Sequence, residues 1–383
     1  MKKFENVLAY VEGRGIVKTS ISFDEKILDT ENALSGAERI ELPDGATVLP
    51  GFVDQHIHGA GGYDAMDADR DALSAMAKTI ASEGTTSFLA TTMTQSKENI
   101  SNALREIKSY REEKNGEGAR IVGVHLEGPF IAASHKGAQP LEYIAAPSSE
   151  VFDEYNAISG GAIKIVTLAP EENGAKELIS HLKERGIVAS IGHSSAKYND
   201  VVMATEAGAS NVTHTYNAQS ALHHREIGVV GSAMLIDELN CELIADTIHV
   251  SVPAMKVLIK NKPKDKVSLI TDAMRAKGLA DGESELGGQK VFVKGGEARL
   301  ADGTLAGSVL RMNVALKNII EKVGISYTDA VDMATINPAR MIGISDECGS
   351  IKTGKRADFA VLDKDFNVIM TVSGGKIVYK RNK

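Results

Sequence analysis

Eight short apolar runs, separated by stretches with helical periodicity, limit most strongly how this chain can fold. Across residues 70–82 apolar side chains recur at i, i+3, i+4 and i+7, and residues 175–185 have a similar apolar face. Strand and helix alternating in this way predict a parallel (β/α)8 barrel, with a doubly wound open sheet as the competing arrangement. The eight runs are Leu49–Gln55, Thr85–Thr92, Arg120–Leu126, Ile163–Ala169, Val188–Gly192, Asn211–Thr215, Glu242–Thr247 and Val267–Thr271.

The two ends of the chain have a different pattern. Short alternating or apolar segments are punctuated there by turn signals such as Asp44-Gly45 and Gly374-Gly375, which predicts β-strands. We therefore expect a small β-sandwich domain built from residues 1–50 and 346–383, and a barrel domain over residues 51–345. The 383 residues suffice for a barrel of about 250 residues and a smaller unit.

Composition narrows the classes of partner. A net charge of −8 without a long basic run argues against nucleic acid or an anionic membrane. The first residues contain two lysines but no apolar stretch, so we expect neither a secretory signal nor a membrane span. The two cysteines, Cys241 and Cys348, lie far apart, which disfavours a thiolate zinc site and favours a reducing cytoplasm.

His56 and His58 follow the first apolar run. Because alternate side chains of a strand share a face, both imidazoles should point the same way, as ligands or as two structural histidines. Barrels gather their active residues at the carboxyl ends of the strands. Five further runs end in polar residues of the ligand type, which include Glu127, His193, His214, His249 and Asp272.

This set of residues predicts a metal-assisted hydrolase. Imidazoles and carboxylates without thiolates suit Zn²⁺ first, with Fe²⁺, Co²⁺ or Mn²⁺ as alternatives. Such an ion lowers the pKa of a bound water toward about 7. A nearby carboxylate can take the released proton and later give it to a leaving group, and Asp272 is the natural choice.

At these residues the chain resembles the amidohydrolase superfamily and, within it, the N-acetylglucosamine-6-phosphate deacetylases. The resemblance spans nearly the whole chain. His-x-His alone would indicate only the superfamily, whereas residues 125–130 and 303–308 are much more specific to the deacetylases. The matching segments are residues 51–54, 56–58, 125–130, 192–194, 213–214, 216–218, 271–274, 303–308, 337–340 and 354–358.

The resemblance implies hydrolysis of the acetamide of N-acetyl-D-glucosamine 6-phosphate to D-glucosamine 6-phosphate and acetate. It implies that Glu127, His193 and His214 hold the principal divalent ion, and that His56 and His58 join Glu127 around a second one. It also implies a homodimer that acts on a small phosphorylated amino sugar.

Further roles follow from the same resemblance. Asp272 carries over as general base and then general acid. Arg225 has independent chemical support, because a guanidinium binds phosphate through two parallel bonds, although a solvated loop arginine is the alternative. Leu305 belongs to a loop near the acetyl group or to a tight turn. The implied substrate contacts are Asn217, Ala218, Arg225, His249, Ala138 and Leu305.

Three positions depart from the pattern of the deacetylases. Gln219 replaces a common Met, Ile227 stands where Pro is expected, and Thr247 replaces a common Gly. None of them removes a ligand, so they bear on the choice of sugar. The competing functions are another amidohydrolase, such as a cyclic amide hydrolase or a deaminase, and a catalytically inactive barrel that serves as a binding protein.

Overall fold

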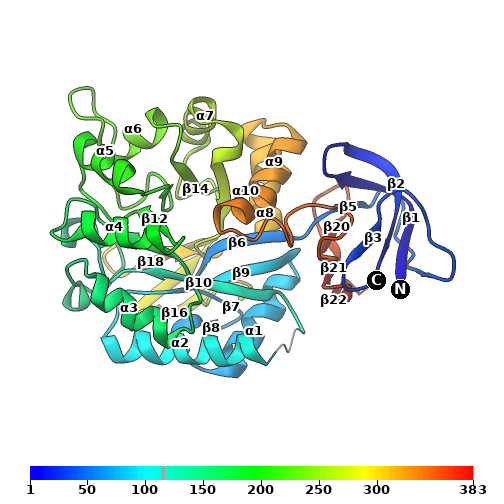
Figure 1. Cartoon of the computed structure of the whole chain (residues 1–383), viewed down its shortest axis with the longest axis horizontal. Helices are drawn as coiled ribbons and strands as arrows, with labels where there is room; N and C mark the ends of the chain where they lie inside the picture. The colour runs from blue at the N-terminus through cyan, green and yellow to red at the C-terminus, as the bar shows by residue number, and fades with distance from the viewer. Residues whose placement is uncertain (114–116, 383) are drawn as a thin grey trace.

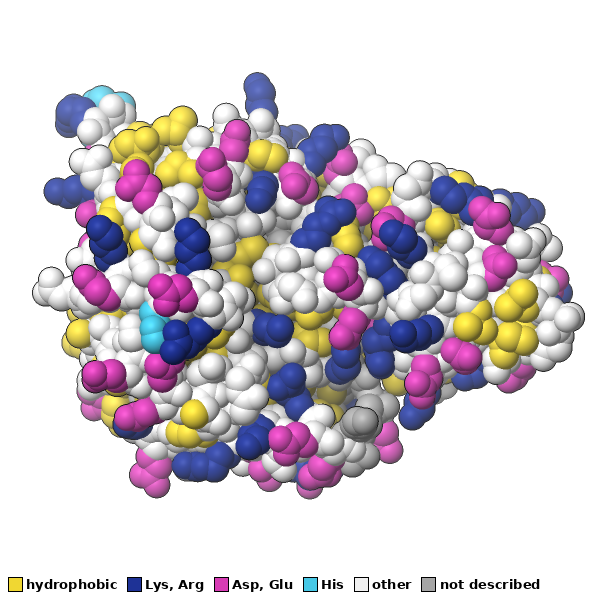
Figure 2. Space-filling model, in the orientation of Figure 1, with side chains coloured by type: hydrophobic (Ala, Val, Ile, Leu, Met, Phe, Trp, Pro, Cys, Tyr) yellow, Lys and Arg dark blue, Asp and Glu magenta, His cyan; other side chains and the backbone are white. Residues whose placement is uncertain are grey.

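The computed structural model describes residues 1–113 and 117–382. A large unit of strands surrounded by helices lies beside a small unit of strands that contains both ends of the chain (Figure 1). Lys, Arg, Asp and Glu side chains are interspersed over the face drawn in Figure 2. None of the helices in the described ranges is both long and apolar enough to cross a membrane.

The large unit is a parallel barrel, so the (β/α)8 prediction is confirmed. Its strands follow the order β15-β14-β13-β12-β11-β10-β9-β6. The ring closes where the backbone N–H of Asp272 donates to the carbonyl of His56 (2.8 Å) and that of His58 donates to Ala273 (2.9 Å). The strands are β6 (Phe52–Ile57), β9 (Thr85–Thr92), β10 (Arg120–Glu127), β11 (Ile163–Leu168), β12 (Val188–Ile191), β13 (Asn211–Val212), β14 (Asn240–Ile244) and β15 (Val267–Ile270).

Helices cover the outside of the barrel, and two of them occupy the stretches predicted from periodicity. Helix α1 begins after Asp69, whose side chain accepts from the backbone N–H of Ala72 (2.9 Å). The helices are α1 (Arg70–Ala81), α2 (Lys97–Glu112), α3 (Ser149–Ile158), α4 (Ala175–Glu184), α5 (Tyr198–Ala207), α6 (Gly228–Leu235), α7 (Val252–Asn261), α8 (Met312–Asn318), α9 (Tyr327–Ala334) and α10 (Ile336–Met341).

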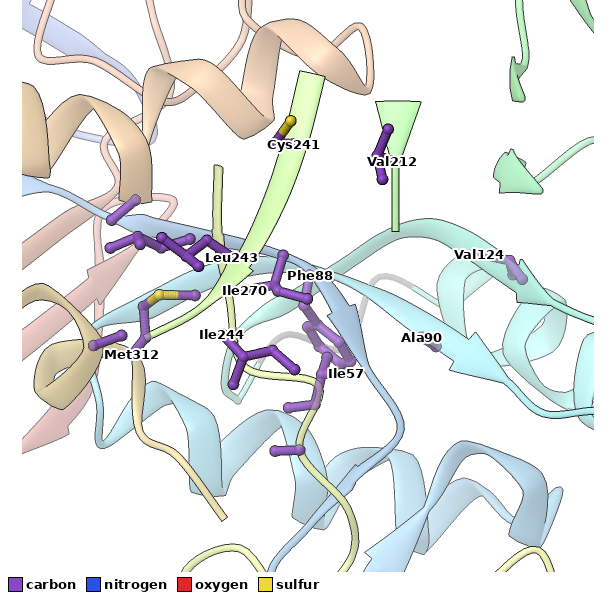
Figure 3. Packing of buried hydrophobic residues seen from close by; sticks show 14 of the residues in the cluster. Ile57, Phe88, Ala90, Val124, Val212, Cys241, Leu243, Ile244, Ile270 and Met312 are labelled. Atoms are coloured by element: carbon purple, nitrogen blue, oxygen red, sulfur yellow. The ribbon is translucent and has the colours of Figure 1, made fainter. Parts of the chain in front are cut away.

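The apolar core lies between the barrel strands and these helices. Ile57, Phe88 and Val124 are completely buried in this cluster, together with Leu73 and Met76 of α1. Figure 3 shows the packing of the strand residues among them. This apolar layer joins the helices to the barrel. The interior of the barrel near the carboxyl ends of its strands is filled by polar side chains instead.

Three predicted strands need correction, and one of them, Glu242–Thr247, lies at Asn240–Ile244 in the structure. The run Leu49–Gln55 is two strands, because residues 47–50 pair with the C-terminal segment and residues 52–57 enter the barrel. Gly51 separates them at a point where a Cβ would lie 2.2 Å from Thr86 Oγ1, so a side chain at this position would clash with the neighbouring strand. The run Asn211–Thr215 shortens to two residues, because the backbone turns left-handed at His214 (φ 29°).

Strands from both ends of the chain form one sheet, in the order β22-β21-β20-β5-β1-β2-β3 with β4 beside β1. Phe4, Phe23 and Phe359 pack at its centre, with ring centroids 5.1, 5.6 and 5.0 Å apart. The strands are β1 (Lys2–Val11), β2 (Gly15–Phe23), β3 (Ile27–Asp29), β4 (Glu38–Arg39), β5 (Thr47–Pro50), β20 (Phe359–Leu362), β21 (Val368–Ser373) and β22 (Lys376–Lys380).

A four-stranded antiparallel sheet follows the last barrel strand and borders the barrel mouth. Gln289 ties it to the loop after β10, because its Nε2 donates to the carbonyl of Ala138 (2.5 Å). Its strands are β16 (Gly282–Leu286), β17 (Gln289–Lys294), β18 (Glu297–Leu300) and β19 (Leu305–Ser308). The remaining short elements are β7 (Gly59–Ala60), β8 (Tyr63–Asp64), 3₁₀ turns at residues 65–67, 133–135, 141–143 and 264–266, and a π-helical turn at 319–323.

Candidate active site and metal centre

The barrel brings the predicted ligands together at one mouth. Glu127 is the last residue of β10, and His193, His214 and Asp272 each lie two residues beyond the end of their strands. These last three have left-handed backbones, with φ of 47°, 29° and 48°. Such conformations are uncommon for residues other than glycine and gather at functional sites. They end each strand by turning its polar side chain into the mouth.

Glu127, His193 and His214 form a compact triangle of ligand atoms. Glu127 Oε1 lies 3.3 Å from His193 Nε2 and 3.1 Å from His214 Nε2, and the two Nε2 atoms are 3.1 Å apart. Bonds of about 2.0–2.1 Å to a tetrahedral zinc ion would place neighbouring ligand atoms about 3.3 Å apart. The spacing of these three side chains therefore fits a single divalent ion.

Hydrogen bonding supports the same conclusion. His193 Nδ1 donates to the backbone carbonyl of His135 (2.9 Å), and a carbonyl can only accept. A neutral His193 ring therefore has a bare Nε2 lone pair, which points at His214 Nε2. Fixing the tautomer through the far nitrogen is how proteins prepare a histidine to bind a metal.

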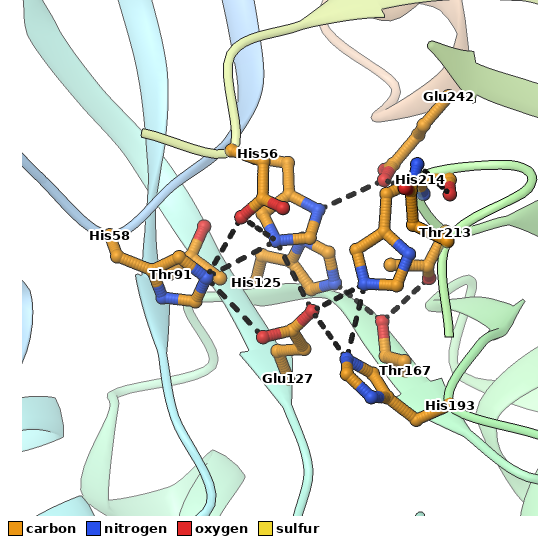
Figure 4. A network of polar contacts seen from close by, with 12 residues as sticks. His56, His58, Thr91, His125, Glu127, Thr167, His193, Thr213, His214 and Glu242 are labelled. Atoms are coloured by element: carbon orange, nitrogen blue, oxygen red, sulfur yellow. Dashed lines mark hydrogen bonds and ion pairs between the residues drawn. The ribbon is translucent and has the colours of Figure 1, made fainter. Parts of the chain in front are cut away.

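A second set of ligand atoms adjoins the first. His56 Nε2 lies 3.4 Å from both His58 Nε2 and Asp272 Oδ1, and His58 Nε2 lies 3.3 Å from the same Asp272 oxygen. Glu127 spans the two sets, with Oε1 3.3 Å from His56 Nε2 and Oε2 3.3 Å from His58 Nε2 (Figure 4). The donor set thus has room for one ion or two.

Charge in this cluster is strongly coupled. Burial raises the pKa of Asp272, but His56, His58 and His214 outweigh that effect and lower it to about 2. Burial lowers the pKa of His58, whereas hydrogen bonds with Asp272 and Glu127 raise it to about 10. Ionised carboxylates therefore draw positive charge into the mouth, which is the electrostatic condition for holding a divalent cation.

A cavity of about 340 Å³ opens above the ligands. It is lined by His58, Glu127, His193, His214 and Asp272 of the cluster, and by Asn217, Ala218, His249, Ala138 and Leu305 among the predicted substrate contacts. Arg225 is the exception. It is exposed, its Nη1 lies 2.7 Å from His224 Nε2, and it is not among the residues that line this cavity, so its contact with phosphate stays a prediction.

Sequence reasoning missed three side chains that support the site. Gln139 Nε2 donates to Glu127 Oε2 (2.7 Å), Asp246 Oδ2 binds His249 Nδ1 (2.6 Å), and Glu242 Oε2 binds His56 Nδ1 (2.9 Å). An acid among the apolar residues of strand β14 was the available signal for Glu242. Nothing in the sequence around Gln139 marks its role.

Two of the positions that depart from the deacetylase pattern lie near residues that line this cavity, since Gln219 follows Ala218 and Thr247 lies two residues before His249. Gln219 holds the loop after β13, since its Nε2 donates to the carbonyl of Thr213 (2.5 Å). Thr247 has a left-handed backbone with φ 71°, a conformation that strains a β-branched residue and suits glycine. Ile227 immediately precedes α6.

Comparison with known proteins gives one consistent answer. A sequence profile of the amidohydrolase family matches residues 47–378. N-acetylglucosamine-6-phosphate deacetylase of Bacillus subtilis (strain 168) is 46% identical over 345 residues, covering 90% of this chain and 87% of its own length. N-acetylgalactosamine-6-phosphate deacetylase of Escherichia coli O157:H7 is 39% identical over 325 residues, covering 85% and 86%.

Solved structures agree with the sequence comparison. The crystal structure of N-acetylglucosamine-6-phosphate deacetylase from Pasteurella multocida superimposes with a TM-score of 0.92 at 31% identity, over 98% of this chain and 99% of that one. Fold, ligand geometry and sequence therefore point in one direction. The chain belongs to the amidohydrolase family and, within it, to the family of the N-acetylglucosamine-6-phosphate deacetylases.

Proposed function

We propose that this protein hydrolyses the acetamide of N-acetyl-D-glucosamine 6-phosphate to D-glucosamine 6-phosphate and acetate. The observation that carries the proposal is Asp272, which faces a cavity beside two sets of metal-ligating side chains. The deacetylases of Bacillus subtilis and Escherichia coli O157:H7 are 46% and 39% identical to this chain, and they support the same reaction class.

In this proposal Glu127, His193 and His214 hold the principal ion, and His56 and His58 with Glu127 hold a second. Zn²⁺ is the first choice, with Fe²⁺, Co²⁺ or Mn²⁺ as alternatives, because the donors are imidazole and carboxylate. A divalent ion there supplies Lewis acidity to the amide carbonyl and to the attacking water.

Asp272 handles the proton. Its low pKa, about 2, keeps it ionised at neutral pH and able to accept a proton from water. The amide nitrogen is a poor leaving group unless it is protonated, so Asp272 then delivers that proton to it as the C–N bond breaks. Its position among the cavity-lining residues gives it access to both partners.

The remaining cavity residues orient the sugar. His249 donates through Nδ1 to Asp246, which leaves Nε2 for the acetamide or a sugar hydroxyl. Asn217, Ala218, Ala138 and Leu305 contribute the other contacts. Arg225 is not among the residues that line the cavity, and we propose that it reaches the phosphate through a movement of its loop or beside a partner subunit of a homodimer.

The proposal also covers the division of the chain into domains and the location of the protein in the cell. We propose that residues 1–50 with 346–383 and residues 51–345 behave as two domains. The sheet shared by the two ends of the chain supports that division. A cytoplasmic location agrees with Cys241 and Cys348, which are buried and not joined to each other.

One second candidate has specific support. The relative from Escherichia coli O157:H7 is named for the galactosamine epimer, and its identity to this chain is comparable with that of the glucosamine enzymes. Gln219 follows Ala218 and Thr247 lies two residues before His249, and both of these neighbours line the cavity, so the two positions can influence the choice of epimer.

Acetate release tests both candidates. The purified protein is assayed on N-acetylglucosamine 6-phosphate, N-acetylgalactosamine 6-phosphate and unphosphorylated N-acetylglucosamine, with metal content measured on the same sample. We expect the first substrate to give the largest kcat/KM, and removal of metal by a chelator to abolish turnover reversibly. No acetate from any of the three, with a cyclic amide hydrolysed or an amine deaminated instead, would overturn the proposal.

A further inference from the structure

A ring of buried polar side chains crosses the barrel interior just beneath the metal ligands, and part of it is drawn in Figure 4. All of its members are completely buried. Each is hydrogen-bonded to the next, so the ring runs from strand to strand and returns to its start. Its members, in order, are Gln55, His125, Thr167, Thr213, Ser190, Asn211 and Glu242.

The direction of each bond in the ring follows from chemistry. His125 Nδ1 lies 3.2 Å from the backbone carbonyl of Gln55, which can only accept, so a neutral ring must accept at Nε2. The Thr167 hydroxyl therefore donates to His125 Nε2 (2.7 Å), and Thr213 donates to Thr167 (2.7 Å). The Ser190 hydroxyl in turn donates to Thr213.

Glu242 is where the donors converge. Asn211 Nδ2 donates both to Ser190 (2.9 Å) and to Glu242 Oε1 (3.2 Å), and Gln55 Nε2 donates to the same oxygen (2.9 Å). The other oxygen, Oε2, accepts from His56 Nδ1 (2.9 Å) and from the backbone N–H of His214 (3.1 Å). A buried carboxylate is stable when several donors satisfy it in this way.

Glu242 thereby contacts one residue of each set of ligands, through the ring of His56 and the backbone N–H of His214. A carboxylate only accepts, so the proton of a neutral His56 ring must sit on Nδ1, and Nε2 is left bare toward His58, Glu127 and Asp272. The His135 carbonyl does the same for His193 in the principal set. The two arrangements differ in charge, because His56 is held by an anion.

From these contacts we infer that Glu242 is the positioning residue that assembles the second ion site, because its carboxylate fixes the tautomer and orientation of His56 and its negative charge raises the basicity of that ring. The inference deepens the proposed function and rests on it for the identity of the metal ligands. Carboxylate partners of this kind raise the basicity of a ligating histidine, and their loss typically costs about 10–100-fold in metal affinity.

His56, His125 and Glu242 also lie close enough together to resemble an ion site of their own. Both nitrogens of His125 are already used, one by Gln55 and the other by Thr167. Glu242 has four donors around its two oxygens. This trio is therefore structural support for the ligands.

The test is metal binding measured without substrate. Metal-free wild type and Glu242→Gln are titrated with Zn²⁺ against a chromophoric chelator, and the two dissociation constants are fitted separately. We expect Glu242→Gln to weaken the second ion about 10–100-fold and the principal ion less than about threefold. The Gln55 amide can rotate to offer Oε1, which has no partner among the described residues, to the new amide, so the variant should fold.

Gln55→Met is the matched control. It removes a hydrogen bond to the same carboxylate from an equally buried position but leaves the His56 contact in place, so the second ion should keep its affinity within about threefold. Equal weakening of both ions in Glu242→Gln, unchanged binding of both, or a wild type that takes up one ion would overturn the inference. A wild type that binds two ions but releases no acetate would instead contradict the proposed function and leave the inference standing.

Discussion

The barrel mouth and the terminal sheet are both buried β-structure, but their buried side chains differ in polarity. The centre of the terminal sheet is aromatic, with Phe4, Phe23 and Phe359 in mutual contact and completely buried. The upper interior of the barrel is filled with histidines, carboxylates and hydroxyls that are just as buried. Apolar packing stabilises the fold, whereas the polar layer is costly to bury and secures the positions of ligand atoms.

The largest effect should come from Asp272→Asn in the mouth. Removing the group that accepts and returns the proton should lower kcat by about 10³-fold. Metal content, measured by elemental analysis, should stay near that of wild type because none of the five proposed ligands of the two ions is changed. Asp265→Asn, at an exposed position in the 3₁₀ turn that precedes β15, is the control. A variant within tenfold of the wild-type rate would show that the mouth does not depend on this carboxylate.

The complementary change is Phe359→Ala in the terminal sheet. Loss of a completely buried aromatic ring should reduce the free energy of unfolding by about 3–5 kcal/mol, measured by urea denaturation. Phe292→Ala, at a side chain that is 42% exposed, should change it by less than about 0.5 kcal/mol. If Phe359→Ala abolished metal binding in the protein that remains folded, the terminal sheet would not act on stability alone, and the contrast between the two regions would be wrong.

Thr247→Gly probes strain at the mouth. Glycine adopts φ 71° freely, and relief of the strained threonine should outweigh the added flexibility of the unfolded chain by about 1 kcal/mol. A higher midpoint of thermal unfolding is the expected result. Thr247→Ala keeps the Cβ and should give no such gain, so equal stabilisation by both variants would rule out backbone strain as the cause.

The smallest effect concerns Glu12, at the end of the terminal sheet. Partial burial raises its pKa, but hydrogen bonds from Ser350, Lys352 and Lys355 lower it to about 2. The stability it contributes is therefore complete above about pH 4.5 and is lost as the pH falls toward 2.

Glu12→Gln should consequently cost at most about 1 kcal/mol at neutral pH, because solvent screens this partly exposed group. The difference from wild type should vanish near pH 2, in urea denaturation series run at several pH values. Glu31→Gln, in a more exposed ion pair with Arg14, should have no measurable effect at either pH. A difference that persists at pH 2 would mean that Glu12 acts through packing.

Much of the fold could be predicted because the strands of a parallel barrel are buried on both faces, which gives short apolar and β-branched runs in the sequence. Thr85–Thr92 is a strand with the predicted bounds, since all eight residues are buried and the segment is rich in β-branched and apolar side chains. The division of Leu49–Gln55 between two sheets could not be predicted. That division depends on the approach of Thr86 to Gly51, a contact between neighbouring strands.

The same limit applies to the site. Glu127, His193, His214 and Asp272 could be predicted because a barrel collects its strand ends, whatever the loops do. Glu242 could not, because its importance comes from four donors on other segments. The contact of Arg225 with phosphate stays a prediction from the chemistry of the guanidinium, because the reach of a loop cannot be derived from the residue types within it.

Gly51 has a practical consequence for anyone who would reuse this scaffold. Only this residue separates β5, anchored in the terminal sheet, from β6, which carries His56. The strand that carries a metal ligand is thus joined directly to a strand of the terminal sheet, with no flexible loop between them. A truncated protein that contains only the barrel, or a transfer of its active site to another protein, would lose the terminal sheet. The position of β6 along the barrel axis, and with it that of His56, would then no longer be fixed by β5.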